Sequence, residues 1–311
     1  MVPSFKILLS YLRNNPLKTV SGIYHQAGMN INVWMHRNLK DPKGIKVMDQ
    51  DWDNLIILDG CRYDLYQEVR GRVECRRSLG SSSWEFLRRN FNNKEYHDTI
   101  YVTANPFAPK LDPDTFFKYH TLLEDGWNPD SKTIEPYKIT NTAVDIWKSN
   151  PQKRLIVHFM QPHYPFIGPT GQQIPQGGLT DNDTDASCLD SKTIWTKLQF
   201  GIDDIDKKVV WKAYKENLEL VLEDAIRLHE NIDGKTVITA DHGNLVGDRV
   251  GPIPVKGYAH PSDLYVPELV EVPWETLSGE RREITKGSPQ NNKSIEQEVV
   301  KDRLKQLGYH S

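Results

Sequence analysis

Three short apolar runs without alternation of polar and apolar side chains constrain the fold of this chain most strongly. They cover residues 53–58, 154–160 and 236–240, and residues 101–103 are predicted as a fourth strand. A strand without alternation is buried on both faces, as strands of parallel sheets are. Helical patterns separate the runs and cover residues 83–91, 140–148 and 208–229. This order predicts an α/β fold with a parallel sheet between two layers of helices.

The composition narrows the class of protein further. With 38% hydrophobic residues among 311, the chain can bury a sizeable core, so it is not a disordered protein. Its apolar runs are strand-length, which excludes a polytopic membrane protein. The net charge of −3 gives no reason to expect a nucleic acid as partner. The three cysteines form no CxxC pair and no dense disulfide framework, and no cleavable signal peptide is recognisable. We therefore expect a cytoplasmic location.

The first 46 residues differ in charge from the rest of the chain. They contain seven basic residues and one acidic residue, and Phe5, Leu8, Leu9 and Leu12 fall at helical spacing. Two interpretations stay open: a surface helix packed on the domain, or a peripheral contact with an anionic membrane surface. We expect three parts: a basic helical segment at 1–46, a catalytic domain at 47–277 with an insertion or lid loop at 168–200, and a polar linker with a C-terminal helix at 278–311.

Polar residues with metal-binding side chains follow the predicted strands directly. Asp59 follows the first run, His163 the second, and Asp241 and His242 the third. In open α/β sheets, ligands bind outside the carboxyl ends of the strands. Carboxylate and imidazole groups there suit one or two divalent ions such as Zn, Mn, Mg or Ca. Each aspartate taken alone could equally cap the next helix.

Several segments resemble the alkaline phosphatase superfamily, and in particular its sulfatase-like members. Residues 237–244 (VITADHGN) are similar to the T-A-D-H-G signature of that superfamily. Further similar segments lie in the family's order at residues 55–63, 158–166 and 258–274. The resemblance implies a three-layer α/β/α sandwich with a mostly parallel central sheet. It also implies metal-dependent chemistry on phosphate or sulfate esters.

The resemblance also implies roles for individual residues. Asp59, Asp241 and His242 would bind one metal ion. His163 and His260 would bind a second metal ion or contact the oxygens of the substrate. Separately, Arg62 could clamp a phosphate in a bidentate manner, or be a surface arginine at the start of a helix. His158 is expected to be structural.

A serine nucleophile is expected in the segment 78–87 (SLGSSSWEFL). By resemblance, Ser81 is the first choice, as nucleophile and fourth metal ligand, and Ser83 is the second. A loop that opens onto a helix N-terminus also presents backbone N–H groups to an anion. Ser82 and Glu85 form a capping-box pattern, so Ser82 is expected to be structural, and all three serines could serve only as caps. The chain has no C-x-P-x-R motif, which argues for an unmodified hydroxyl rather than formylglycine.

The function expected from these residues is hydrolysis of phosphate or sulfate esters through a covalent serine intermediate. One alternative is a phosphotransferase that modifies a glycan or a lipid head group. Another is a non-catalytic binding module on the same scaffold. The expected partner is a phosphorylated or sulfated small molecule, a glycan or a lipid head group.

Overall fold

A seven-stranded sheet forms the centre of the computed structural model, which describes residues 16–40, 42–176, 193–202, 204–290 and 295–309. The strand order is β2-β9-β6-β1-β5-β3-β4. Only β9 runs against its neighbours β2 and β6, and the other pairs are parallel. The strands are β1 (Asn54–Asp59), β2 (Glu74–Arg77), β3 (Tyr96–Thr103), β4 (Phe116–Thr121), β5 (Arg154–Pro162), β6 (Thr236–Ala240) and β9 (Glu271–Leu277).

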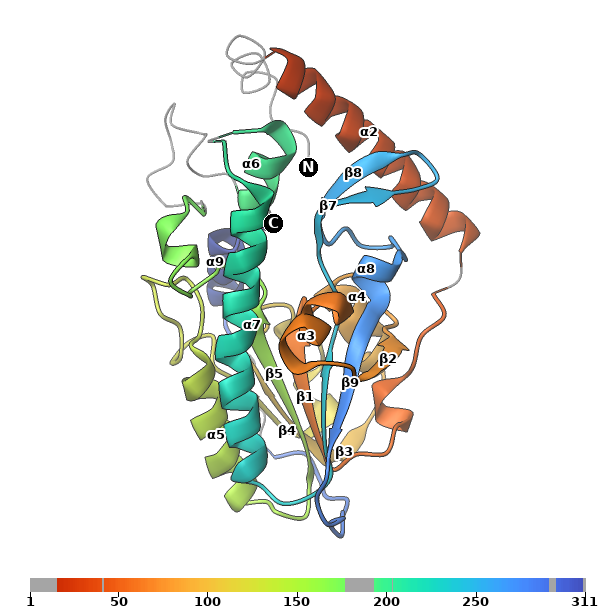
Figure 1. Cartoon of the computed structure of the whole chain (residues 1–311). Helices are drawn as coiled ribbons and strands as arrows, with labels where there is room; N and C mark the ends of the chain where they lie inside the picture. The colour runs from red at the N-terminus through yellow and green to blue at the C-terminus, as the bar shows by residue number, and fades with distance from the viewer. Residues whose placement is uncertain (1–15, 41, 177–192, 203, 291–294, 310–311) are drawn as a thin grey trace.

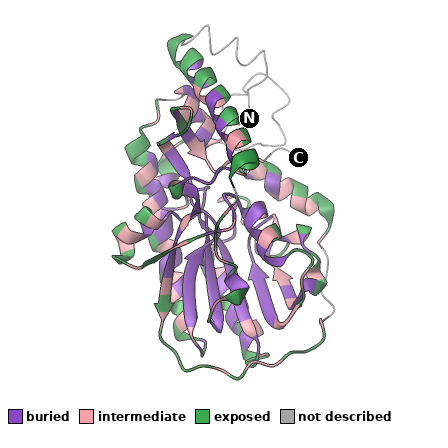
Figure 2. Cartoon of the chain, turned by 90° about the vertical axis from the view of Figure 1, so that its right-hand side faces the viewer, coloured by how far each residue is buried: buried purple, intermediate pink, exposed green. Residues whose placement is uncertain are grey.

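Helices cover both faces of this sheet, which explains the missing alternation in the strands. On β1, Leu55 and Ile57 belong to the core cluster that includes α4, whereas Ile56 and Leu58 belong to the cluster that includes α5 and α7. Figure 2 shows the sheet as the buried centre, with exposed residues on the outer sides of the helices. The predicted three-layer, mostly parallel α/β/α architecture is therefore confirmed. The covering helices are α3 (Tyr63–Arg70), α4 (Ser83–Phe91), α5 (Pro136–Lys148) and α7 (Lys207–Glu230).

A second, smaller layer lies beyond the carboxyl ends of the parallel strands (Figure 1). It contains the antiparallel hairpin of β7 (Leu245–Val250) and β8 (Val255–Ala259), and α2 (Pro16–Leu39) packs on β8. Short helices α6 (Ile194–Phe200) and α8 (Pro267–Val270) adjoin this hairpin. The carboxyl ends of the parallel strands therefore face this second layer.

The C-terminal part returns to the main domain. Residues 278–290 form no helix or strand, and α9 (Gln297–Gln306) follows. Arg303 of α9 donates a hydrogen bond to the carbonyl oxygen of Leu123, and Trp127 donates one to Gln306. The expected helix around residues 5–12 and residues 177–192 of the expected 168–200 loop lie outside the described residues. The domain boundaries stay predictions.

Candidate functional site

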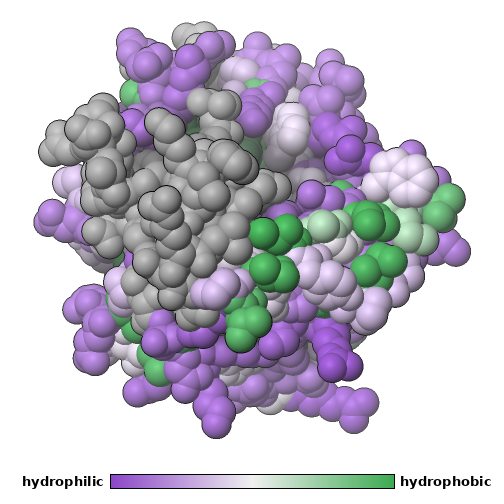
Figure 3. Space-filling view, turned by 90° about the horizontal axis from the view of Figure 1, so that it is seen from above, coloured by the Kyte–Doolittle hydropathy of each residue, from purple (hydrophilic) through white to green (hydrophobic). Residues whose placement is uncertain are grey.

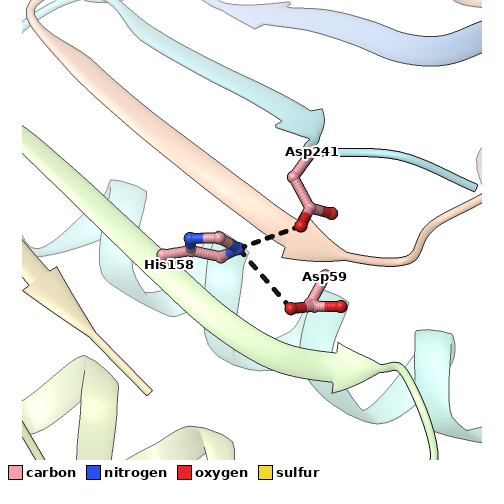
Figure 4. A group of neighbouring side chains, drawn as sticks. All are labelled: Asp59, His158 and Asp241. Atoms are coloured by element: carbon pink, nitrogen blue, oxygen red, sulfur yellow. Dashed lines mark ion pairs between the residues drawn. The ribbon is translucent and has the colours of Figure 1, made fainter. Parts of the chain in front are cut away.

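Asp59, His158 and Asp241 come together at the carboxyl end of the central strands (Figure 4). Asp59 ends β1, Asp241 follows β6, and His158 lies on β5; β1 pairs with both other strands. One potential ligand atom from each residue lies within 4.8 Å of the other two, and all three side chains are fully buried. Sheet order therefore brings together residues that are up to 182 positions apart in the chain.

In each of these three side chains, one polar atom is hydrogen-bonded to the protein and another has no hydrogen-bond partner. Asp241 Oδ1 accepts from the backbone N–H groups of Gly60 and His242, at 2.9 and 2.8 Å. His158 Nδ1 lies 2.9 Å from the Tyr101 hydroxyl. The free atoms are Asp59 Oδ1, Asp241 Oδ2 and His158 Nε2. Buried polar atoms are normally paired, so three unpaired atoms on neighbouring buried side chains indicate a missing ligand.

The spacing and chemistry of these atoms fit a divalent metal ion. Two ligands of a tetrahedral Zn²⁺ lie roughly 3.4 Å apart, given bonds of about 2.0–2.1 Å. His242 Nε2 lies 3.4 Å from Asp241 Oδ2 and 3.8 Å from Asp59 Oδ1. His158 Nε2 lies 3.7 Å from Asp241 Oδ2 and 3.8 Å from Asp59 Oδ2. The two carboxylates and the His158 imidazole can therefore hold a metal ion here, and the His242 imidazole lies beside them.

The electrostatics of the two carboxylates point to the same conclusion. Burial raises the pKa of Asp59 well above its ordinary value, and the nearby charge of Asp241 raises it further. Burial also opposes ionisation of Asp241, but His242 and His158 hold the pKa of Asp241 below its ordinary value. A buried pair of like charges is costly without a compensating cation. A bound divalent ion would supply that compensation.

The local backbone orients the metal-facing side chains. Gly60 has a φ of +64°, a left-handed conformation that directs its N–H toward Asp241. Next to Asp241, Nδ1 of His242 lies 2.6 Å from the carbonyl oxygen of Gly243. This contact places the imidazole proton on Nδ1 and leaves the Nε2 lone pair facing the site. A Cβ atom at Gly243 would lie 2.1 Å from the carbonyl oxygen of Glu268, so only glycine fits there.

Of the candidate serines, Ser83 lies beside the carboxylate and histidine cluster. Ser83 Oγ is 3.2 Å from Asp59 Oδ2 and 3.1 Å from His242 Nε2. Ser81 Oγ instead lies 3.0 Å from Glu85 Oε2 and 2.9 Å from the carbonyl oxygen of Pro261. Ser83 is also the first residue of α4, where the N-terminal end of the helix dipole favours an anion.

The expected capping box at the start of α4 has a different form. Ser82 is the N-cap residue, but its side chain caps no backbone N–H, and its Oγ lies 2.7 Å from Ser262 Oγ. Glu85 Oε2 instead accepts from the backbone N–H of Ser81 at 3.0 Å. Ser81 and Glu85 together fix the loop before the helix, because Leu264 N–H also donates to Ser81 Oγ.

His163 and His260 meet at the edge of the cluster, together with Tyr309. Their Nε2 atoms lie 2.9 Å apart, and the Tyr309 hydroxyl lies 3.3 Å from the first and 3.0 Å from the second. The rings of His242 and His260 stack with centroids 4.5 Å apart. Burial and the neighbouring His242 lower the pKa of His163 to about 4, so this imidazole is neutral at neutral pH. Burial likewise lowers the pKa of His260.

The Arg62 side chain, near the end of β1, is surrounded by hydrogen-bond acceptors of the protein. Its guanidinium donates to both carboxylate oxygens of Asp64, to Asp248 and to the carbonyl oxygen of Asn244. It also stacks over Trp211 at 5.0 Å from the ring centroid. Since these groups already engage its Nε, Nη1 and Nη2 atoms, the predicted phosphate clamp would require their rearrangement. Arg62 is buried, unlike the surface arginine of the alternative interpretation.

Three residues of the site did not emerge from the sequence as site residues. Asn105 donates from Nδ2 to Asp59 Oδ2, and it comes two residues after the end of β3, so the strand-end rule could have found it. His158 was expected to be structural, and only the unusual position of an imidazole within an apolar strand marked it. Tyr309 follows α9 near the end of the chain, and no local pattern signals its contact with the histidines.

Comparison with known proteins gives matches among solved structures alone. No protein-family model and no curated protein matches the sequence. The C-terminal periplasmic domain of EptC from Escherichia coli, in complex with Zn, is 12% identical over 71% of both chains, with a TM-score of 0.40. A protein of the alkaline phosphatase superfamily from Vibrio parahaemolyticus is 10% identical over 92% of this chain and 76% of that one, with a TM-score of 0.37. The superfamily expected from the motifs is named among these matches.

A third match is the integral membrane protein lipooligosaccharide phosphoethanolamine transferase A (EptA) from Neisseria meningitidis. It is 12% identical over 87% of this chain, with a TM-score of 0.43. The chain spans 58% of its length. At these sequence identities and TM-scores, an activity has to be inferred from the residues of the site.

The expected cytoplasmic location needs correction. The matched structures of EptC from Escherichia coli and Campylobacter jejuni are periplasmic domains, and EptA is an integral membrane protein. The expectation rested on cysteine usage and on the absence of a recognisable signal peptide, which are weak indicators of compartment. Among the residues that the structure describes, no helix has the length and apolar character needed to cross a membrane.

Proposed function

We propose that this protein is a metal-dependent enzyme acting on phosphate esters, with Ser83 as its nucleophile. The observation that supports this most directly is the position of Ser83 Oγ, 3.2 Å from Asp59 Oδ2 and 3.1 Å from His242 Nε2. Asp59 belongs to the group of side chains that can hold a metal ion, and His242 Nε2 lies 3.4 Å from Asp241 Oδ2 of the same group. On this ground the proposal prefers Ser83 to Ser81, the first choice from the sequence.

Each residue then has a distinct task. Asp59, Asp241 and His242 would hold the ion, with His158 as a further ligand or as a partner of the two carboxylates. A divalent cation bound there supplies Lewis-acid chemistry that activates a hydroxyl group and offsets negative charge. Ser83 Oγ attacks phosphorus in line as the ester P–O bond opposite breaks. The hydroxyl proton has two acceptors within 3.2 Å, and the leaving oxygen departs as an alcohol after gaining a proton. His163 and His260 would contact the oxygens of the transferred group.

The second half of the reaction decides between hydrolysis and transfer. Water resolves the phosphoserine intermediate in a hydrolase, and an alcohol does so in a phosphotransferase. The same side chains serve both outcomes, because the acceptor differs and the site does not. Sulfate esters have a similar tetrahedral centre and belong in the same assays.

The test compares single-serine variants with unmodified enzyme. We expect hydrolysis of p-nitrophenyl phosphate, or of the corresponding diester or sulfate, with Zn, Mn, Mg or Ca present. Ser83→Ala should lower kcat by at least about 10³-fold, the loss typical of a missing nucleophile. Its metal content, measured by elemental analysis, should stay near that of the unmodified protein, whereas Asp241→Asn should lose the metal.

Ser82→Ala is the matched control, since the hydrogen-bond partner of Ser82 Oγ among the described residues is Ser262 Oγ rather than a member of the metal-binding group. It should retain activity within about twofold.

Full activity of Ser83→Ala together with inactivity of Ser81→Ala would restore the original choice of nucleophile. A protein that binds no metal and turns over none of the esters would instead be a binding module. Adding glycerol as an acceptor, and measuring glycerol phosphate, separates transfer from hydrolysis.

A further inference from the structure

Helix α2 exposes most of its large apolar side chains, whereas the polar side chains of Thr19, Asn32 and His36 are buried. Nine large hydrophobic side chains are exposed among the described residues, and seven of them lie on this helix. Leu17 is 83% exposed and Trp34 is 61% exposed. We call this set the α2 stripe: Leu17, Val20, Ile23, Tyr24, Ile31, Trp34 and Leu39. Figure 3 views this end of the molecule and shows hydrophobic side chains gathered in a band over α2.

The inner face of α2 explains why the stripe points outward. Asn32 exchanges two 2.8 Å hydrogen bonds with the backbone of Ile253, and His36 Nδ1 accepts from Tyr265 N–H. A Cβ atom on Gly22 would lie 2.5 Å from the Phe200 ring, so the glycine permits close packing. These specific contacts fix the rotation of the helix about its axis. The stripe is therefore held outward by the fold itself.

The chemistry of this surface matches a lipid bilayer. Aliphatic side chains combined with Trp34 and Tyr24 suit the boundary between acyl chains and head groups. The segment that carries the stripe is basic in composition: residues 1–46 contain seven of the chain's 39 basic residues and one of its 42 acidic residues. Of these, Lys18 pairs with Asp204 and Arg37 with Asp263. Lys40, directly after the helix, is exposed. Such basic segments are attracted to anionic lipids.

The position of α2 relative to the site is also informative. Both α2 and the metal-binding side chains lie at the carboxyl end of the parallel strands (Figure 1). A molecule that rests on a bilayer through the α2 stripe would thus place this end of the sheet toward the membrane. We propose that the α2 stripe docks the protein peripherally onto an anionic lipid surface, with this end facing the bilayer.

A second copy of the chain is a less suitable occupant. Two copies that packed through their stripes would bring two strongly basic segments together, and like charges at an interface oppose association. An anionic membrane instead neutralises the same charges. The apolar surface and the charge of this segment therefore both favour lipid as the binding partner. Dimerisation is the alternative that the experiment can detect.

The experiment is co-sedimentation of the full-length chain with vesicles of phosphatidylcholine, with and without 30 mol% phosphatidylglycerol. The unmodified protein should pellet with the anionic vesicles, and less so with neutral vesicles or in 0.5 M salt. Ile31→Gln combined with Trp34→Gln should weaken vesicle binding at least tenfold. Tyr137→Gln is the matched control, because Tyr137 is a similarly exposed aromatic residue on α5.

Each result bears directly on the proposal. Equal pelleting of the double variant and the unmodified protein overturns it, as does no pelleting of the unmodified protein with either vesicle. A concentration-dependent dimer in analytical ultracentrifugation that the double variant abolishes, without vesicle binding, assigns the face to a second copy instead. Unchanged thermal unfolding of the variants shows that loss of binding is not loss of fold. None of these measurements depends on turnover, so they stand apart from the test of Ser83.

Discussion

At the scale of single residues, the contacts of Tyr309 say most about how a substrate would bind in the site. Its hydroxyl lies within 3.3 Å of the Nε2 atoms of both His163 and His260, the two nitrogens proposed to contact the substrate. Phe107 packs against its ring in an edge-to-face arrangement. The phenol thus occupies hydrogen-bonding positions that an oxygen of the substrate would take.

Replacing Tyr309 by phenylalanine should therefore favour substrate binding. A buried hydrogen bond contributes about 1 kcal/mol net, so KM should fall by about fivefold while kcat changes less than twofold. Steady-state kinetics on the best aryl phosphate would measure both constants. Tyr137→Phe makes the same chemical change far from these histidines and should leave KM unchanged. A tenfold drop in kcat for Tyr309→Phe would show instead that the hydroxyl assists the reaction.

The sequence can indicate a site residue where the fold imposes its position, but not where the direction of a side chain decides. Asp59, Asp241 and His242 were predicted because the ends of parallel strands share one edge of the sheet. The order of Ser81 and Ser83 depends on which hydroxyl faces that edge, and two positions on a tight turn before a helix differ mainly in direction. Tyr309 could not be predicted, since its contact depends on how α9 packs against the domain.

At the scale of elements, α3 and β9 are joined by a hydrogen-bonded ion pair. Arg70 donates to both oxygens of Glu275, at 3.1 and 2.5 Å, and the Tyr66 hydroxyl donates to Oε2 of the same carboxylate. Burial favours the neutral acid, but these donors outweigh it and lower the pKa of Glu275 below its ordinary value. The Glu275 carboxylate thus links β9, the only antiparallel strand of the described main sheet, to helix α3.

We expect Glu275→Gln to lower the free energy of unfolding by roughly 1–2 kcal/mol at pH 7. The pKa in the folded state lies below the ordinary value of 4.5, so the stabilisation is present above that value. It is lost as the pH falls through the lower, folded-state pKa. Urea unfolding at several pH values should show the difference between the two proteins shrinking below about pH 4.

Glu271→Gln is the control on the same strand. Glu271 pairs with Arg77 at 3.7 Å, and both side chains are well exposed, so this pair should contribute little. A pH-independent loss in Glu275→Gln would mean that packing, rather than ionisation, accounts for its effect.

At the scale of the whole molecule, the candidate metal ligands connect distant parts of the chain. Asp59, His158 and Asp241 come from three strands of one sheet, so an ion bound there stabilises the folded state as a unit. A ligand at 1,000 times its dissociation constant adds about 4.1 kcal/mol. For a domain of this size, this is a rise in Tm on the order of 5–15 °C.

Differential scanning fluorimetry with and without a chelator would measure this shift. Asp241→Asn should show a much smaller rise when Zn or Mn is added, because it lacks one of the two carboxylates. Equal rises in both proteins would place the ion elsewhere.

The architecture itself was the most predictable level. Strands whose residues are all apolar, separated by amphipathic helices, indicate a sheet that is buried on both faces. Strand β1 is an example, because Leu55 and Ile57 pack on one face and Ile56 and Leu58 on the other. The antiparallel β9 and the β7–β8 hairpin were not predicted as such. Their pairing depends on tertiary neighbours rather than on a periodic pattern of their own.

The central position of β1 has a consequence for synthesis on the ribosome. Asn54 of β1 pairs in register with Thr236 of β6, 182 residues later. At about 5–20 residues per second, roughly 10–35 s separate the translation of these two strands. During this time the apolar segment Leu55–Leu58 has no β6 to pair with, which exposes it to misassociation. A nascent chain of this topology therefore depends on being shielded until its C-terminal third has emerged.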